Sequence, residues 1–430
     1  MDGGEGEVRI VEAERQQIEL REFHLDGMVG AEHPVRTVWA FVEGLDLSGL
    51  YAGMGSVEGR AGRPAIDRKI LVALWLYGTI EGVGSARALE RLCREHVAYE
   101  WICGGVGVNY HTLSDFRVRH GEVLDELLTQ SVAALLREGL VRLKRVAQDG
   151  MKVRASAGAA SFRRKQTLRG CQRQAREHVQ ELRKELEEDP GASTRREQAA
   201  KERAARERAE RVKKALERAR ELEQEREKSK SKSRAKKDSA AVRASTTDPQ
   251  ARVMKMGDGG WRPAYNVQLA TDTGTQIVVG VDVTNRGNDQ GHIEPMLDQL
   301  QERYGVVPAE TLVDGGYTGH ADLEAVAGRT KVYAPVPKPR VAGVDPHQPK
   351  PTDSPSIAQW RTRMKTAGAQ RIYRQRAATA ECVNAQARNR GLVRVLVRGL
   401  QKVRAVALWY ALAHNLKRML SLGILNPASA

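Results

Sequence analysis

The sequence predicts a mixed α/β protein with three parts: a helical N-terminal domain, a mixed sheet flanked by helices, and a long charged helical insertion after the first strand of that sheet. Apolar residues recur with helical spacing between positions 34 and 141. After residue 142, short β-branched runs alternate with helical patterns, which is typical of a sheet covered by helices. Residues 161–250 hold 27 Lys and Arg but 17 Asp and Glu, so ten of the sixteen excess positive charges lie there.

These patterns set the expected boundaries. We expect an N-terminal helical domain over residues 1–140, a core over 141–162 and 251–400, a charged hairpin and basic linker over 163–250, and a C-terminal amphipathic helix over 401–430.

The composition narrows the class of protein. Four cysteines lie far apart without a Cys-x-x-Cys pair, which argues against a disulfide framework and a structural zinc site and indicates a reducing compartment. No run of about 18 apolar residues is present, and the first residues are acidic where a signal peptide is basic. We therefore expect a cytoplasmic protein that does not bind membranes. The net charge of +16 favours an anionic partner.

Two apolar faces predict packed helices in the N-terminal domain, one over residues 70–76 and one over 88–93. Pro64 lies where a helix could begin, with Asp67 in its first turn.

A further helix is predicted to start near Thr112, since Thr112 followed by Asp115 resembles a capping box. This helix carries Arg117, Arg119 and His120. It can be an ordinary surface helix, or it can be the recognition helix of a helix-turn-helix unit, whose N-terminal residues contact DNA.

The core pattern opens with a strand over 143–147 that ends at Gln148-Asp149-Gly150. After the insertion, a hairpin turn joins two further strands. The expected elements are strands over 265–270, 276–283, 310–313 and 331–336, and helices over 293–304, 321–326, 372–390 and 391–422. This order indicates a mixed sheet flanked by helices.

The insertion is rich in Ala, Glu, Arg and Lys and lacks aromatic residues after Phe162, which is typical of a long solvated helix or coiled coil. Two apolar stripes separated by residues 189–194 predict a helical hairpin over 173–228, with Ser193 or Thr194 capping its second helix. The hairpin can be a solvated charged face or an interface between copies of the chain. The Ser-, Lys- and Arg-rich stretch over 229–245 indicates a flexible linker that contacts phosphates.

The last helix and Trp261 lie outside these patterns, and each has two interpretations. The last helix has an apolar stripe through Leu408, Leu412 and Leu416, and we expect it to pack in the core or on a partner. Trp261 can stack on an unpaired base or can anchor the return from the insertion by being buried.

Three acids stand out in the core. Asp149 and Asp314 each follow an apolar strand at its carboxyl end, beside Gly, where ligands bind in such sheets. Glu381 is a lone carboxylate in a basic helix that carries Arg371, Arg374 and Arg376. Each has an ordinary interpretation: a strand-end Asp forms turns, and Glu381 can neutralise the arginines around it.

At these residues the sequence resembles the DDE transposases of bacterial insertion sequences, whose core has the ribonuclease H-like fold. Residues 61–117 look like the helical N-terminal domain of one group of these enzymes, and the segments around Asp149 and Asp314 look like their first and second Asp segments. Tyr373, Arg376 and Glu381 resemble the Tyr, Arg, Glu signature, and Arg388 stands where its longer form has Lys. Glu381 is five residues after Arg376, whereas the strict signature has the acid four residues after, where this chain has Ala380.

The resemblance implies a metal-dependent enzyme that cuts DNA and transfers the freed strand. Asp149, Asp314 and Glu381 would hold two Mg²⁺ ions, for which Mn²⁺ can substitute, with Asp149 bridging both. The expected DNA contacts come from Tyr373, Arg376 and Arg388 in the core and from Arg117 and Arg119 in the N-terminal domain.

Other residues and partners follow from this resemblance. Tyr373 can instead pack against the core. The partners would be the terminal inverted repeats and target DNA, bound by a homodimer in the nucleoid. Two alternatives remain: a non-catalytic DNA-binding protein that acts as a repressor, and a nuclease without strand transfer.

Overall fold

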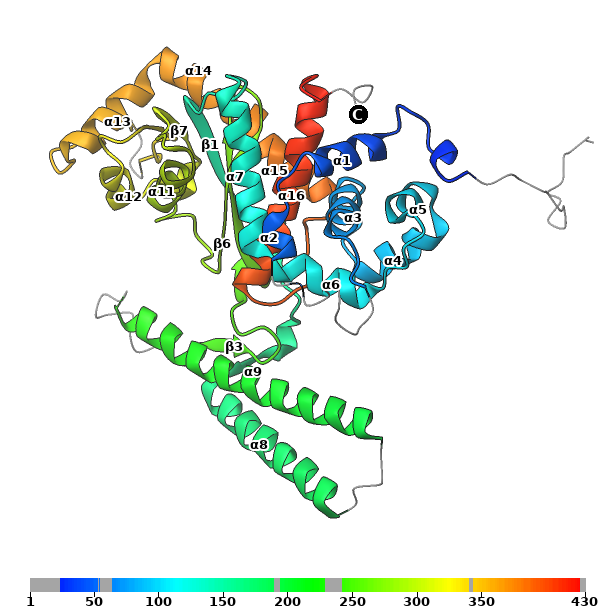
Figure 1. Cartoon of the computed structure of the whole chain (residues 1–430). Coiled ribbons are helices and arrows are strands. Elements are labelled where there is room, and N and C mark those ends of the chain that lie inside the picture. The colour runs from blue at the N-terminus through cyan, green and yellow to red at the C-terminus, as the bar shows by residue number, and fades with distance from the viewer. Residues whose placement is uncertain are drawn as a thin grey trace, which may run out of the picture.

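The computed structural model describes residues 24–52, 54, 64–188, 194–228, 242–339 and 343–425. In them a helical N-terminal part and a sheet lie on either side of the long helix α16 (Leu400–Ser421), and a helical hairpin projects away from both (Figure 1). The predicted mixed α/β class is confirmed.

The N-terminal part is all helical, as the apolar spacing predicted. Its helices are α1 (Pro34–Glu43), α2 (Ser48–Tyr51), α3 (Arg68–Ile80), α4 (Ala86–Glu95), α5 (Val97–Cys103), α6 (Tyr110–Arg119) and α7 (Gly121–Arg137). Short 3₁₀ turns lie at Asp26–Met28, Ala159–Ser161 and Gly315–Tyr317 elsewhere in the chain.

Two helix starts differ from the prediction by a few residues. Asp67 is the N-cap of α3 and lies outside its first turn, with its carboxylate accepting a hydrogen bond from the Lys69 amide at 2.9 Å. Helix α6 begins before Thr112, because Asn109 caps it and accepts from the Thr112 amide at 2.9 Å. Both side chains satisfy amides that the first helical turn leaves free.

The sheet combines antiparallel and parallel strands. Its strands are β1 (Arg145–Arg154), β4 (Arg252–Lys255), β5 (Trp261–Asp272), β6 (Val278–Thr284), β7 (Glu310–Leu312) and β8 (Lys331–Tyr333). The order is β4-β5-β1-β7-β8, and β6 also pairs with β5. Strand β1 is antiparallel to β5 and parallel to β7, and β7 is parallel to β8.

The first strand is longer than its sequence pattern indicated, so the placement of Asp149 at a strand end was wrong. Asp149 lies in the middle of β1, opposite Leu269 of β5, and the pairing continues to Arg154. Only the parallel partner β7 stops early, at Leu312. The ladder to β5 therefore carries β1 past the acid.

The helices after the sheet are α11 (Ile293–Tyr304), α12 (His320–Ala325), α13 (Pro355–Lys365), α14 (Ala367–Arg376) and α15 (Cys382–Asn389). The predicted helix over 372–390 is not uniform, because a π-helical segment, Ala377–Glu381, separates α14 from α15. The predicted helix over 391–422 was too long, since it starts at Leu400. Gly391 and Gly399 have φ of 92° and 90°, which an α-helix does not accommodate. Helix α13 had not been predicted.

The insertion forms the predicted hairpin of α8 (Lys165–Glu188) and α9 (Arg195–Lys228), closed at its base by β2 (Phe162–Arg164) and β3 (Arg243–Ser245). Thr194 caps α9, since its Oγ1 accepts from the Glu197 amide at 3.3 Å. The hairpin has its own small apolar cluster, which includes Leu168, Leu216 and Leu222. The predicted break and most of the basic linker, residues 189–193 and 229–241, lie outside the described residues. The end of the linker is not flexible coil, because it forms β3.

Helix α16 packs in the core. Of the two interpretations of its apolar stripe, core packing is therefore confirmed. It contacts α3, α6 and α7 on one side and β6 on the other. Trp409 donates from Nε1 to the Arg117 carbonyl at 3.0 Å, and the Asn415 side chain accepts from the Val278 amide and donates to the Val278 carbonyl, each at 2.8 Å. In the described part of the chain, no helix combines the length and apolarity that a membrane span requires.

Candidate active site

Asp149 and Asp314 lie side by side on the sheet. Ala147 of β1 pairs with Leu312 of β7 in parallel register, which sets each acid two residues beyond a paired residue. Asp314 then caps the turn Gly315–Tyr317, its Oδ1 accepting from the Gly316 amide at 2.7 Å. The strand-end prediction was right for Asp314.

The guanidinium of Arg376 joins all three acids. Its Nη2 lies 3.1 Å from Asp149 Oδ1 and 3.9 Å from Asp314 Oδ2, and its Nη1 donates to Glu381 Oε1. Arg376 is buried at 8% exposure, although it comes from a helix of otherwise solvated arginines. A positive charge buried at this depth is stable only with such partners. The structure therefore brings the three predicted acids to one point.

The π-helical segment explains the unusual spacing of Glu381. A π-helix inserts one residue into an α-helix and leaves the flanking α-helical turns in register. Arg376 ends α14 and Glu381 ends the π segment. The extra residue moves Glu381 onto the face where an acid four residues after Arg376 lies in a regular helix. Ala380, at that strict position, is buried at 2% exposure.

Burial and charge act in opposite directions on this cluster. Burial raises the pKa of Asp149, and the nearby charge of Asp314 raises it further, while Arg376 and a hydrogen bond from Asn384 Nδ2 at 2.9 Å oppose the rise. Burial lowers the pKa of Arg376, but the carboxylates around it outweigh burial and hold its pKa above the usual value. Arg376 therefore stays charged among the acids.

The other residues predicted to contact DNA differ in how far they are exposed. Tyr373 is half-buried against the cluster of Ile357 and Trp360, which agrees with core packing. Arg388 is exposed and lines a groove described below. Arg119 is exposed on α6, 3.6 Å from Asp115.

Arg117 does not face solvent. Its Nη1 donates to the Gly84 carbonyl at 2.7 Å, and its guanidinium stacks over the Trp75 ring. Burial lowers the pKa of Arg117 to about 10. An exposed recognition-helix contact from Arg117 is inconsistent with this position, so we do not carry it into the DNA interface.

Trp261 is not a buried anchor. It is 68% exposed, at the start of β5, where it pairs with Lys255 of β4. Directly opposite residues of an antiparallel pair share one face of the ribbon. This position is inconsistent with a buried anchor and agrees with the other interpretation, in which the ring is accessible to stack on an unpaired base.

A buried polar network lies on the face of β1 opposite to Asp149, and it had not been predicted. Asp289, which follows β6, accepts from Lys152 Nζ at 2.8 Å, from Asn266 Nδ2 at 2.6 Å and from Gln268 Nε2 at 2.9 Å. Tyr317, three residues after Asp314, donates to Gln268 Oε1. Burial raises the pKa of Tyr317, and the charges of Asp289, Asp149 and Asp314 add to this effect. Two amides at alternate positions of an apolar strand, Asn266 and Gln268, were the available sequence signal.

A basic groove of about 680 Å³ is lined by Gly150, the residue after Asp149. Its cations come from β1, from the β4–β5 hairpin and from α15: Lys152, Arg154, Lys255, Arg262 and Arg388. The acid that lines it, Asp258, pairs with Arg262 at 2.6 Å. Such a surface suits a phosphate backbone.

The three acids offer the oxygen donors that a divalent metal needs, but with Arg376 among them their spacing is not that of a metal site. Among the described residues, no group of three or more His, Cys, Asp or Glu side chains is spaced to hold a metal ion. Hard carboxylate oxygens are the ligands Mg²⁺ prefers. Asn384 donates from Nδ2 to Asp149 Oδ2, and its Oδ1 is buried without a hydrogen-bond partner. A cation, the guanidinium, already lies among the acids, so the site attracts positive charge.

Two protein families match the chain. The transposase DDE domain matches residues 230–416, and a transposase domain (DUF772) matches residues 23–119. The first match contains Asp314, Arg376 and Glu381, and Asp149 lies outside both matched ranges. No curated protein and no solved structure matches the chain. Enzymes with this domain cut and rejoin DNA strands, and in the described structure both matched ranges contribute to one core around α16. The chain is therefore a DDE transposase of the insertion-sequence type.

Proposed function

We propose that this transposase cuts DNA at the ends of its element and transfers the freed strand at a site formed by Asp149, Asp314 and Glu381. The observation that carries the proposal is the convergence of these three acids on Arg376. They come from β1, from the residues after β7 and from the π-helical segment, so local sequence does not bring them together. The sheet order, with β6, β5 and β1 antiparallel and β7 and β8 parallel to β1, supports a ribonuclease H-like core.

Two Mg²⁺ ions, or Mn²⁺ in their place, would be held by the three carboxylates, with Asp149 between the other two. When bound, the ions supply an acidified water and neutralise charge at the phosphate and the leaving oxygen. Asn384 orients Asp149 through its amide. Arg376 neutralises the acids in the absence of metal and therefore competes with metal for them.

The basic groove would hold the DNA beside the cut. Arg388, Arg154 and Lys255 are exposed, line the groove and can pair with successive phosphates. Trp261, on the face of the hairpin that carries Lys255, is available to stack on a base.

A repressor that only binds DNA does not need these acids. Burial makes the charge of Asp149 unfavourable in the folded chain, as its raised pKa indicates. A carboxylate whose pKa is raised by burial beside specific charged partners is typical of catalytic sites. This arrangement favours the enzyme over the non-catalytic alternative.

The decisive experiment compares cutting with binding. Purified protein with Mg²⁺ or Mn²⁺ is expected to cut DNA that carries its own terminal inverted repeats, and Asp149→Asn and Asp314→Asn are expected to lower the rate at least 10³-fold, on the order of the loss from removing a key catalytic group. Their affinity for DNA should stay unchanged in a gel-shift assay. Asp298→Asn, an exposed acid paired with Arg329, is the matched control. Normal cutting by either active-site variant would refute the site.

Strand transfer needs a separate readout. A labelled 3′ end that appears joined to target DNA identifies a transposase reaction, whereas release of the label only as a hydrolysed end identifies a nuclease.

We also propose that residues 1–140 bind DNA, that the chain divides at the boundaries predicted from sequence, and that two copies bring two element ends together in the nucleoid. The hairpin over 173–228 is the candidate interface between the copies, since it projects from the core (Figure 1). Sedimentation of the DNA complex with and without the hairpin tests this. Unchanged pairing of two ends after its removal would exclude the interface.

A further inference from the structure

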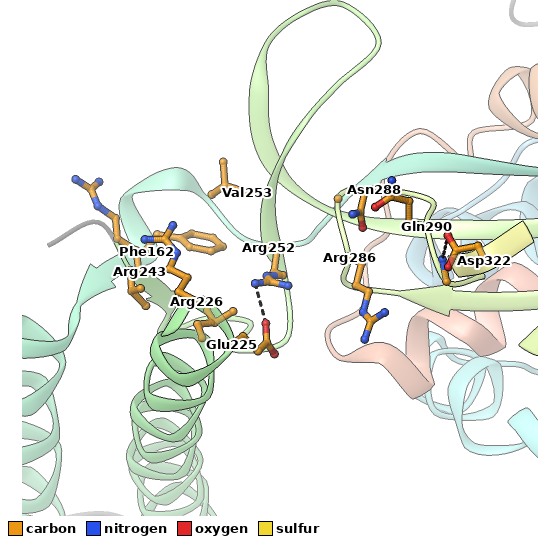
Figure 2. Close-up of a pocket in the computed structure, with 14 residues that line it drawn as sticks. Phe162, Glu225, Arg226, Arg243, Arg252, Val253, Arg286, Asn288, Gln290 and Asp322 are labelled. Carbon is orange, nitrogen blue, oxygen red and sulfur yellow. Dashed lines mark hydrogen bonds and ion pairs between the residues drawn. The ribbon is translucent and has the colours of Figure 1, made fainter. Parts of the chain in front are cut away.

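A second groove lies where the insertion meets the core. It has a volume of about 970 Å³. Figure 2 shows its two sides: Phe162, Arg226 and Arg243 on the insertion, and Arg286, Asn288, Gln290 and Asp322 on the core. Arg252 of β4 lies between the two sides. The groove is therefore built by segments far apart in the sequence, and neither the core nor the hairpin makes it alone.

The groove is positively charged. Four arginines line it: Arg226, Arg243, Arg252 and Arg286. The two acids that line it have partners within the protein. Glu225 pairs with Arg252 at 3.2 Å and with Arg218 at 3.3 Å, and Asp322 accepts from the Gly291 amide at 2.9 Å.

Two of the arginines are available for a ligand. Arg243 and Arg286 are exposed, and neither guanidinium pairs with a carboxylate among the described residues. Arg243 lies on the insertion side of the groove and Arg286 on the core side (Figure 2). Guanidinium groups on both sides suit the phosphates of a chain that passes between them.

This second groove adjoins the basic groove that Gly150 lines. Gly287 lines both grooves, and β4 contributes Val253 to one and Lys255 to the other. Val242, which follows the Ser-, Lys- and Arg-rich linker in the sequence, lines the second groove. A basic path therefore runs from Gly150, beside Asp149, past Gly287 to the base of the insertion.

We propose that the second groove binds the phosphate backbone of DNA that flanks the cut site, so that the base of the insertion is part of the DNA path. This rests on the proposed function, because it takes the acids as the place where DNA is cut. The insertion then has a role on DNA that is independent of any contact between copies.

The test measures binding without metal. Wild type and Arg243→Gln/Arg286→Gln are titrated into a labelled duplex that carries the terminal repeat and its flanks, across a range of salt. We expect the double variant to bind at least about 10-fold more weakly near 0.1 M salt, with the slope of log Kd against log salt smaller by about 2, as for the loss of two phosphate contacts. Arg203→Gln/Arg208→Gln, two exposed arginines of α9 outside the groove, removes the same charge and is the control.

Shortening the duplex separates a contact from a folding defect. Shortening the duplex at the end that lies in the second groove should make the double variant and wild type bind equally. Shortening it at the other end should preserve the difference in affinity between them. A loss equal to that of the control pair, or a loss that no trimming removes, would overturn the proposal. Since binding is measured on uncut DNA without metal, failure of Asp149→Asn to abolish cutting would remove the active-site assignment and leave this result standing.

Discussion

Gly150 lies next to Asp149, the acid proposed to be catalytic, and faces the buried amides on the other face of β1. A methyl group at this position would lie 2.2 Å from Asp289 Oδ1 and 2.4 Å from Gln268 Nε2, closer than real contacts allow. Its conformation is ordinary, so the requirement for Gly comes from lack of space. The residue keeps the Asp289 carboxylate close behind the site.

Gly150→Ala should therefore lower the free energy of unfolding by about 1–3 kcal/mol, the usual effect of overpacking a closed core. Chemical denaturation measures this. Gly158→Ala, where a methyl group meets nothing within 4 Å, is the matched control. Equal stability of the two variants would show that the network around Asp289 yields easily.

At the residue scale, the sequence identified the acids but not their surroundings. Asp149, Asp314 and Glu381 could be selected because each stands out from its local pattern. Asp289 could not, since its partner Lys152 lies 137 residues earlier in the sequence and faces it only after β1 pairs with β5. The burial of Arg117 was equally hidden, because it depends on Trp75 of another helix.

The π-helical segment is an element whose role can be tested by deletion. Removing exposed Ala377 should turn the segment into regular helix and keep Glu381 facing Arg376. We expect this deletion to retain cutting within about tenfold, since the flanking turns stay in register.

Deleting Ala385, an exposed residue of regular helix α15, is the control. It rotates the following buried residue Ala387 by about 100° relative to Asn384 and should abolish cutting. If both deletions are equally harmful, the extra residue has a function beyond register.

Helix α16 contains a buried histidine that makes its packing sensitive to acid. His414 Nε2 lies 2.8 Å from the Gln276 carbonyl, and burial lowers the pKa of His414 to about 4 from 6.5. The unfolded chain therefore takes up a proton near pH 6.5 while the folded chain stays neutral. Stability from this group is present above pH 6.5 and is lost as the pH falls toward 4.

His414→Gln keeps a donor toward Gln276 and removes this titration. Between pH 7.5 and pH 5, wild type should lose about 1–2 kcal/mol more unfolding free energy than the variant. Denaturation at the two pH values gives the difference. Parallel losses would show that water reaches His414 in the folded protein.

At the element scale, local pattern predicted the existence of most helices and strands and failed at their ends. The cap Asn109 lies just before the helix that Thr112 had been expected to start. Strand β1 continues because of β5, which follows only after the whole insertion. The end of a helix that a local capping residue sets can be predicted from the sequence, whereas the end of a strand that a distant pairing partner sets cannot.

At the scale of the whole molecule, the hairpin has an apolar cluster of its own, separate from the two clusters of the core. Replacing residues 174–213 by a short Gly-Ser turn should therefore leave the melting temperature of the core unchanged within about 1 °C, because the described residues of this range belong to neither core cluster. Calorimetry on the two proteins checks this. A clear fall in the core transition would show that the outer hairpin supports the sheet.

The overall architecture was accessible from sequence because charge and periodicity change sharply at its boundaries. The excess of positive charge marked the insertion, and the strand and helix order marked the mixed sheet. The two connected grooves were not accessible, since they arise where the insertion, β4 and the loop after β6 meet in space.

The position of α16 has a consequence for how the enzyme matures on the ribosome. Its side chains fill the space between the N-terminal helices and β6, yet it is synthesised after every other helix and strand that the structure describes. Both halves must wait with exposed apolar surface until it emerges. The core of the enzyme is thus complete only once α16 has left the ribosome, and a chain that stops before Leu400 should be inactive.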